Sequence, residues 1–168
     1  GAECFEKLEG RFDGYVARAG TGGTFTGVAR YLKERIPNVY CVVVEPQGSI
    51  LKGGEAGPHE VEGIGASSFI PSVLDMSLAD DVIMVEDDPA FAMVNRLAAE
   101  EGVLGASSAG ADVNAALPGA ENIGPGKRVC ALVPDACDRF LYNGVFTQWF
   151  RGEEIGMMQA VLYSVLGP

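Results

Sequence analysis

A glycine- and threonine-rich segment near the amino end holds the residues best suited to bind an anion. Residues 19–27 (AGTGGTFTG) follow an apolar stretch and precede residues with helical spacing. Glycines lack Cβ, so consecutive backbone N–H groups can converge on one point, and the first turn of a helix adds unpaired donors and partial positive charge. Thr21, Thr24 and Thr26 can add hydroxyl donors. The segment therefore predicts a cradle for a phosphate group, formed by residues 20–24.

Spacing separates this cradle from two common nucleotide-binding loops. In a P-loop the last glycine precedes Lys and then Ser or Thr, whereas Gly27 precedes a valine and an alanine, which excludes that loop. The dinucleotide pattern GxGxxG, started at Gly20, reaches Phe25 where a glycine is required, although Glu45 could imitate the ribose-binding acid. A nicotinamide-dependent oxidoreductase is thus one minor alternative, and a glycine-rich turn that binds no ligand is another.

Composition limits the classes of partner. The 168 residues suit one domain, and 48% of them are hydrophobic, which is typical of a globular protein. The formal net charge of −11 opposes binding to nucleic acid or to an anionic membrane, so a small-molecule ligand is expected. Four scattered cysteines and a lone histidine, His59, predict no metal site. Reduced thiols in the cytoplasm are the expectation.

Strand and helix patterns alternate along the chain. The predicted strands are residues 12–17, 39–45, 81–85, 103–104 and 129–133. The predicted helices are residues 2–9, a segment from the cradle to Pro37, a segment from Asp88-Pro89 to a stop at Gly102, and a segment from residue 107 to residues 118–119. Residues 47–64 form a long loop, and Asp135 is an expected N-cap. The alternation predicts a doubly wound α/β fold with a mainly parallel sheet.

Three further segments follow the cradle in a fixed order. They are EGIG at 62–65 with FIP at 69–71, EGVLGASSAG at 101–110, and VPD at 133–135. Together with the cradle they resemble the cysteine synthase and cystathionine β-synthase family, which are pyridoxal-phosphate enzymes of fold type II. The resemblance extends to about Asn143. It implies a cofactor-binding α/β domain at residues 1–143, followed by a helical tail at 144–168, where apolar residues at helical spacing predict a packing or dimer helix.

The resemblance implies a role for each matched segment. The phosphate of pyridoxal 5′-phosphate would be held by Gly20, Thr21, Gly22, Gly23 and Thr24. A turn that lets backbone approach cofactor and substrate would be formed by Gly63, Ile64 and Gly65. The end of the strand beside the cofactor's ring nitrogen would be formed by Pro134 and Asp135.

Ser108 matches the serine whose hydroxyl bonds to the pyridine nitrogen in this family. A neutral hydroxyl leaves the ring a weaker electron sink than a carboxylate would, which favours elimination of a β-substituent. Taken alone, Ser107 and Ser108 are better explained as helix-capping residues, and the order of the other motifs reverses this preference in favour of the cofactor role. The chain departs from the family by an extra residue between Gly65 and Phe69, which bears on the substrate pocket.

The family's Schiff-base lysine is expected upstream of this sequence. None of the four lysines matches it: Lys7, Lys33, Lys52 and Lys127. No catalytic residue is therefore predicted within the chain, which looks like the C-terminal portion of a longer enzyme. The missing N-terminal half would be supplied in cis or in trans.

The resemblance implies an enzyme acting on a small amino-acid substrate. The expected reaction is β-replacement on O-acetylserine or serine with sulfide, which forms cysteine, in a cytoplasmic homodimer. Condensation of serine with homocysteine, as in cystathionine β-synthase, is an alternative. A non-catalytic module that binds a phosphorylated ligand or a partner is another, and the sequence does not decide between the nucleophiles.

Overall fold

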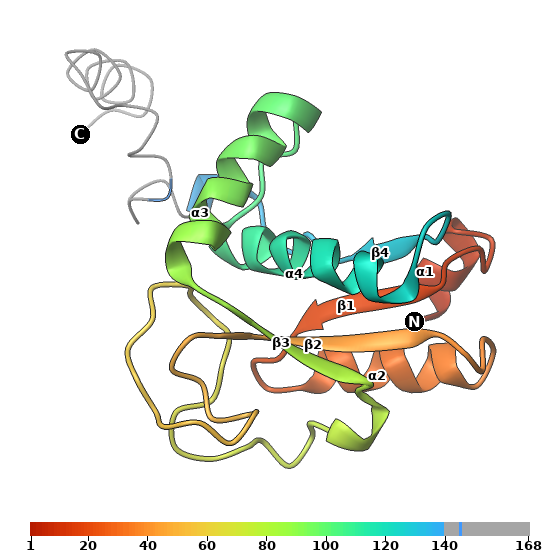
Figure 1. Ribbon diagram of the computed structural model, residues 1–168, viewed down its shortest axis with the longest axis horizontal. Helices are drawn as coiled ribbons and strands as arrows, with labels where there is room; N and C mark the ends of the chain where they lie inside the picture. Colours follow the sequence, from red (N-terminus) through yellow and green to blue (C-terminus); the bar gives the residue numbers. More distant parts are fainter. Residues whose placement is uncertain (140–144, 146–168) are drawn as a thin grey trace.

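The computed structural model describes residues 1–139 and residue 145, which include a four-stranded sheet (Figure 1). Every strand pair in this sheet is parallel, and the strand order is β3-β2-β1-β4. The strands are β1 (Gly14–Arg18), β2 (Tyr40–Pro46), β3 (Asp81–Val85) and β4 (Val129–Ala131). This topology confirms the predicted doubly wound, mainly parallel fold.

Helices cover both faces of the sheet. They are α1 (Ala2–Lys7), α2 (Gly23–Lys33), α3 (Asp87–Arg96) and α4 (Ser107–Ile123). In Figure 1, α2 lies below the sheet, whereas α3 and α4 lie above it. α1 packs against α2 through an edge-on contact of Phe5 with Tyr31, whose ring centroids are 6.3 Å apart. No helix within residues 1–139 has the length and apolar character needed to cross a membrane.

Alternation along the two central strands divides the core into two layers. Tyr15 of β1 faces α2 and stacks on Phe25, with ring centroids 6.1 Å apart. Val16 of β1 and Val42 of β2 face the opposite layer, where they pack with Ala111 of α4. A strand buried on both faces must be apolar at every position, which explains the continuous β-branched run of β2.

The two helical crossovers lie on opposite faces of the sheet. One crossover runs from β1 through α2 to β2, and the other runs from β3 through α3 and α4 to β4, on the far side of β1. The strand order therefore reverses between β1 and β4. In doubly wound sheets the carboxyl ends of the strands form a ligand-binding crevice at this switch point. We refer to this place as the crevice.

The predicted strand at residues 103–104 is wrong. Val103 N–H donates to Leu97 O at 3.0 Å and so closes the π-helical turn Leu97–Glu101 that follows α3. Leu104 O accepts from Cys137 N at 3.1 Å, and only the next residue, Gly105, forms an isolated antiparallel bridge with Ala136. The position beside β1 that a fifth strand could occupy is taken by β4.

Several predicted boundaries shift. The helix predicted to begin at Asp88-Pro89 begins one residue earlier, at Asp87, with Glu86 as its N-cap. The Asp87 carboxylate accepts from the N–H groups of residues 60 and 61, at 2.9 and 3.1 Å, and so joins the first turn of this helix to the loop before β3. α4 continues through Pro118 to Ile123. α2 ends at Lys33, four residues before the predicted stop, and β4 ends at Ala131 rather than at residue 133.

The reason for the longer α4 is packing. A Cβ on Gly119 would lie 3.7 Å from Val16 and 3.9 Å from Val42, so this part of the helix rests directly on the sheet. Pro118 itself is exposed, and burial of the neighbouring face outweighs its missing hydrogen bond. The predicted tail at 144–168 falls almost wholly outside the described residues, so the domain division at residue 143 stays a prediction.

Candidate functional site

The predicted site residues come from segments that meet at the crevice (Figure 1). The cradle follows β1, and residues 134–135 follow β4, the strand beside β1. α4 begins with Ser107 at the same end of the sheet. Because the carboxyl ends of parallel strands share one edge, residues far apart in the sequence are brought together here.

The cradle has the backbone geometry of an anion site. Gly22 is the left-handed N-cap of α2, with φ 86°, and a Cβ there would lie 2.4 Å from Leu74 Cβ. Thr26 N–H makes the first bond of the helix, to Gly22 O at 3.0 Å. The amides before Thr26 begin the helix without an intrahelical acceptor, and the side chains of Thr21 and Thr24 are exposed beside them. These donors suit a phosphate group.

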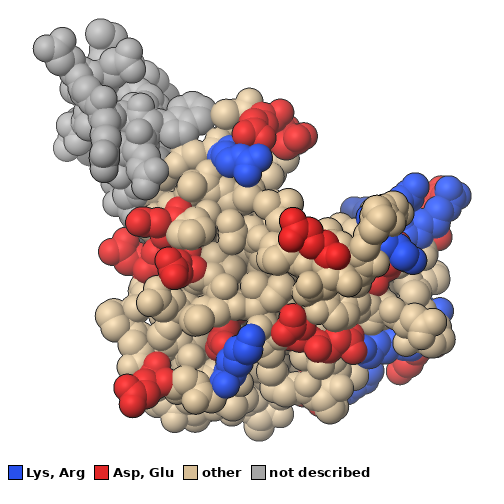
Figure 2. All heavy atoms as spheres, in the orientation of Figure 1, with Lys and Arg blue, Asp and Glu red and all other residues tan. Residues whose placement is uncertain are grey.

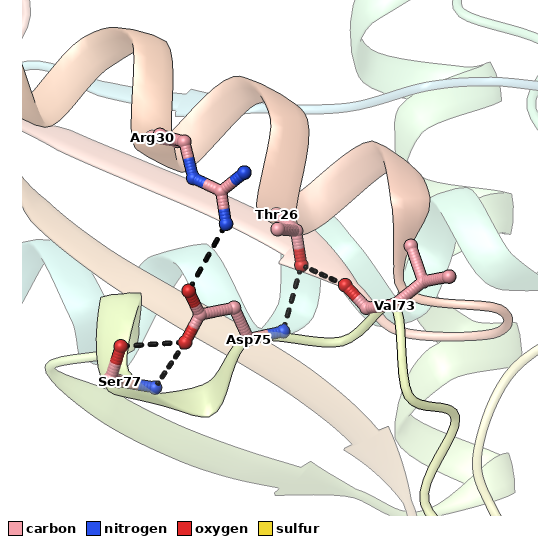
Figure 3. A network of polar contacts seen from close by, with 5 residues as sticks. All are labelled: Thr26, Arg30, Val73, Asp75 and Ser77. Carbon is pink, nitrogen blue, oxygen red and sulfur yellow. Dashed lines mark hydrogen bonds and ion pairs between the residues drawn. The ribbon is translucent and has the colours of Figure 1, made fainter.

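Thr26 does not serve the cradle, contrary to the prediction. Its buried hydroxyl donates to Val73 O at 3.0 Å and accepts from Asp75 N–H at 2.9 Å (Figure 3). Asp75 in turn receives Arg30 Nη2 at 3.2 Å and the N–H and hydroxyl of Ser77 at 3.1 and 2.5 Å. This network fastens the loop after the cradle to α2, so the Thr26 donor is already used.

The turn at residues 63–65 lies directly against the cradle. Gly65 N–H donates to Ala19 O at 2.8 Å, and a Cβ on Gly20 would lie 2.6 Å from Gly63 O. Gly63 and Gly65 both have positive φ, at 72° and 83°. Ile64 is 6% exposed and belongs to the core, so only the backbone of this turn can face a ligand.

Ser108 lies in the first turn of α4 and is 4% exposed. The N-cap of this helix is Ala106, so neither Ser107 nor Ser108 occupies the capping position, which weakens the alternative of a capping role. Ala106 N–H donates to Asp135 O at 3.2 Å, which places the segment after β4 beside the start of α4. A short 3-10 helix, Cys137–Arg139, begins two residues after Asp135, so Asp135 does not occupy the predicted N-cap position in the described residues.

The four lysines are engaged away from the crevice. Their ammonium groups contact Glu3 (Lys7, 2.8 Å), Asp80 (Lys33, 2.7 Å), Val82 O (Lys52, 2.9 Å) and Asp13 (Lys127, 2.8 Å). These partners lie on α1 or at the end of the sheet where the strands begin. That none of them is a cofactor lysine stays a prediction.

One pair of charged residues at the crevice escaped sequence analysis. Arg18, the last residue of β1, donates from Nη1 to Asp112 Oδ2 of α4 at 3.0 Å. Their side chains are 17% and 0% exposed. Burial raises the pKa of Asp112 to about 7, although the charge and hydrogen bonds of Arg18 oppose this shift. The only feature of the sequence that could have indicated this pair is the charged residue Arg18 at the end of a strand that is otherwise apolar.

Glu45, the acid considered for a nicotinamide ribose, is not available to a ligand. Its side chain is 1% exposed within β2. Its Oε2 atom is buried without a partner among the described residues. The minor alternative of a dinucleotide-binding oxidoreductase therefore loses the residue that supported it.

The fold is that of a doubly wound α/β domain, with a candidate anion cradle at the crevice. The sequence model of the family described as "Pyridoxal-phosphate dependent enzyme" matches residues 1–135. The chain belongs to this family, whose enzymes depend on pyridoxal phosphate.

Relatives narrow the class further. The chain is 44% identical over 144 residues to the cysteine synthase of Helicobacter pylori (strain ATCC 700392 / 26695), covering 86% of this chain and 47% of that protein. It is 44% identical over 146 residues to the O-acetylserine dependent cystathionine beta-synthase of Bacillus subtilis (strain 168), covering 87% and 47%. The solved cysteine synthase of Entamoeba histolytica matches with a TM-score of 0.83 at 32% identity, covering 96% of this chain and 48% of that one. The chain thus has the fold of the type II enzymes and spans about half the length of the curated relatives it matches.

The residues present fit the family's cofactor. Gly20 and Gly22 bring backbone closer than a side chain would allow, whereas a Cβ on Gly23 would meet nothing nearer than 4.0 Å, so the mouth of the cradle is open. The donors there are amides and hydroxyls, which suit a phosphate ester. Ser108 offers a neutral hydroxyl for a ring nitrogen.

Proposed function

We propose that this chain is the cofactor-binding α/β portion of an enzyme that replaces the β-substituent of O-acetylserine or serine with sulfide and so forms cysteine. The names of the relatives support this reaction. The observation that carries the proposal is the meeting of the cradle with the start of α4 at one switch point.

In this proposal each segment contributes a different contact. The amides of residues 20–24 hold the phosphate and fix the orientation of the ring, because one end of the cofactor is anchored by several donors at once. The turn at residues 63–65 approaches with backbone alone and so leaves room for the substrate. Residues 134–135 hold the start of α4 through the bond between Ala106 and Asp135.

Pyridoxal phosphate, when bound, withdraws electrons from the bonds at the substrate's α-carbon. Ser108 would donate a hydrogen bond from its hydroxyl to the ring nitrogen and leave that nitrogen unprotonated. With such a neutral partner the ring withdraws electrons less strongly than a protonated ring would, and this weaker withdrawal favours departure of a β-substituent. Proton transfer at the α-carbon is assigned to a lysine in the part of the enzyme that this chain does not cover, since the four lysines here are paired elsewhere.

A binding titration tests the cofactor site. Adding pyridoxal phosphate to the purified chain should give saturable binding, followed by absorbance and by fluorescence, with little borohydride-reducible label on protein. Gly22→Ala should weaken this binding at least about tenfold, because a side chain there strains the backbone of the cradle. Gly27→Ala is the matched control, since a Cβ at this α2 position meets nothing within 4 Å.

The outcomes separate the proposal from its failures. If Gly22→Ala leaves the binding of both inorganic phosphate and pyridoxal phosphate unchanged, the cradle is not the binding site. A stoichiometric reducible label on one of the four lysines would contradict the assignment of the lysine to another segment.

We propose further that turnover needs the upstream half of the enzyme, in a cytoplasmic homodimer. The coverage of the relatives and the four free cysteines support this view. Mixing the chain with a purified upstream half of a cysteine synthase should restore sulfide-dependent cysteine formation, and sedimentation should give the mass of a dimer. Binding of the cofactor without turnover in any such mixture would favour a non-catalytic module.

The choice of nucleophile has a second candidate. Homocysteine in place of sulfide is favoured by the name of the Bacillus subtilis relative. Competing sulfide against homocysteine in the restored enzyme, with cysteine and cystathionine measured together, decides between them.

A further inference from the structure

The Arg18–Asp112 pair is the most buried ion pair of the described residues, and the roles proposed above do not use it. Its partners are 94 positions apart in the sequence and meet through a bond of 3.0 Å between Nη1 and Oδ2. Asp112 is fully buried, and its second oxygen, Oδ1, has no partner among the described residues. Arg18 keeps a small exposed fraction, 17%.

The position of the pair follows from strand geometry. β1 is paired with β4 only as far as Val16, opposite Ala131, so the β4 side of Arg18 is uncovered. Ala19 N–H points to the other neighbour, β2, since it donates to Val44 O. Because successive N–H groups of a strand alternate sides, the backbone N–H of Arg18 faces the gap between β1 and β4. Its side chain lies on the same face of the sheet as that of Val16, two residues earlier, and meets Asp112 of α4 there. That gap is the crevice.

Helix geometry brings the same pair next to Ser108. Ser108 and Asp112 are four positions apart on α4, so their side chains lie on one face of the helix with Cβ atoms about 6 Å apart. Both are buried at the start of the helix. The guanidinium of Arg18, which Asp112 holds, therefore lies on the Ser108 side of the crevice. In the sequence, Arg18 precedes the first cradle residue, Gly20, by two positions.

Stability alone does not account for this pair. Taking two charges out of water is costly, and a buried ion pair can often be replaced by apolar side chains of similar volume without loss of stability. An acceptor left unpaired, such as Asp112 Oδ1, adds to that cost. The neighbouring positions that face this layer of the core are filled by small apolar residues, among them Ala111 and Ala115.

We propose that Arg18, held in place by Asp112, is a positioning residue of the ring-nitrogen subsite and keeps that nitrogen unprotonated. A fixed cation disfavours the protonated form of a nearby base. Arg18 and Ser108 then act in the same direction, since the hydroxyl can donate only to an unprotonated nitrogen. This inference rests on the cofactor site proposed above.

The test reads the ring nitrogen directly, by ¹⁵N NMR of pyridoxal phosphate labelled at the pyridine nitrogen and bound to the full 168-residue chain. The wild-type chain should give the resonance of an unprotonated pyridine. The double variant Arg18→Met/Asp112→Leu removes both charges with side chains of similar size, and its resonance should move toward that of a protonated pyridine. Its Kd for the cofactor should change by less than about threefold, because the cradle is intact.

Two further variants separate a charge effect from a structural one. Arg18→Lys keeps the cation and should retain the wild-type resonance. Lys127→Met removes a cation at the opposite end of the sheet and should also leave the resonance unchanged.

Each outcome bears on the proposal. A protonated ring nitrogen in the wild-type chain overturns it, even where the double variant fails to fold. An unchanged resonance in a folded, cofactor-binding double variant overturns it as well. Absence of cofactor binding by the wild-type chain would instead refute the proposed function, and this inference with it.

Discussion

The two ends of the sheet hold their charges in different ways. Where the strands begin, Lys127 contacts Asp13 at 2.8 Å with side chains 48% and 38% exposed, and Asp13 also accepts from Arg128 N–H at 3.0 Å. At the carboxyl end, Arg18 and Asp112 are enclosed and one carboxylate oxygen is unpaired. On the face shown in Figure 2, most Lys and Arg side chains gather at the right, where α2 ends and the strands begin.

This contrast distinguishes ion pairs that are exposed to solvent from an ion pair that is buried next to a candidate binding site. An exposed ion pair contributes little free energy to folding, because each charged group gives up contacts with water to gain its partner. Salt screens the remaining attraction. A buried pair must offset a large desolvation penalty, so its presence at the crevice points to a role in binding. The same end carries Glu45 Oε2, a second buried oxygen without a partner among the described residues.

The largest expected effect comes from breaking the buried pair. Arg18→Ala leaves the carboxylate of Asp112 without its cation and should lower the free energy of unfolding by about 3 kcal/mol at pH 8, the lower end of the range for a broken buried pair, because Asp112 can still take up a proton. Urea unfolding, with the midpoint and slope fitted together, measures it.

Lys127→Ala is the matched change at the other end of the sheet. It should leave the urea midpoint unchanged within error, since both partners are exposed. Equal losses from the two variants would contradict the distinction between the ends. Arg18→Met/Asp112→Leu should recover most of the loss, because no buried charge is left unpaired.

The next effect concerns the contact of α3 with α4 at the crevice. A Cβ on Gly110 would lie 2.1 Å from Ala90 O and 2.7 Å from Val94 Cγ2, so Gly110→Ala should destabilise the fold by about 1–3 kcal/mol. Gly119→Ala, on the same helix toward the other end of the sheet, meets only ordinary contacts beyond 3.7 Å. It should be neutral or should stabilise by up to about 1 kcal/mol, because alanine suits a helix interior better.

Thermal melting of these two glycine variants measures the difference. A Gly110→Ala protein as stable as the Gly119→Ala protein would mean that α3 can move away from α4 freely. The position of α4 would then not be fixed by this contact.

Much of this fold could be predicted because its helices and strands are decided by residues that are close together in the sequence. The strand Asp81–Val85 was predicted with the bounds that it has, since a short apolar run ends at an acidic helix start. Gly102 stops the helix after α3 in the left-handed conformation, at φ 67°, as expected for a glycine there. The pair Val103-Leu104 misled, because two apolar residues indicate a strand only where a neighbouring strand is free.

The site was predictable only where backbone conformation decides it. The cradle follows from glycine spacing, since only glycine allows the close approaches at Gly20 and Gly22. The use of the Thr26 hydroxyl depends on Val73 O, 47 positions away, and the Arg18 contact spans 94 positions. Such tertiary partners leave no periodic trace in the sequence.

The pH dependence of stability sharpens the contrast further. The pKa of Asp112 is raised from a model-peptide value of 3.8 to about 7, so the folded state binds its proton more tightly than the unfolded state does. This group's contribution to stability therefore falls as pH rises from about 4 to about 7, by at most about 1.4 kcal/mol per pH unit. Asp112→Asn cannot ionise and should lack that slope.

Urea unfolding of both proteins at several pH values from 4 to 8 gives the difference in their unfolding free energies. The wild type should lose stability relative to Asp112→Asn as the pH rises through this window, and the difference should level off above it. A relative gain with rising pH would mean that Arg18 lowers the pKa of Asp112 more than burial raises it.

The smallest effect belongs to an exposed pair under salt. Lys33 contacts Asp80 at 2.7 Å with side chains 25% and 37% exposed, so Lys33→Met should change stability by less than about 1 kcal/mol. Raising the ionic strength from about 0.01 M to about 1 M shortens the Debye length from about 30 Å to about 3 Å and should remove most of that difference. The difference between wild type and Arg18→Ala should persist at both salt concentrations, because water and ions do not reach Asp112. If salt removed both differences equally, the carboxyl end of the sheet would be as open to solvent as the end where the strands begin. The distinction between a buried ion pair at the crevice and exposed ion pairs elsewhere would then be wrong.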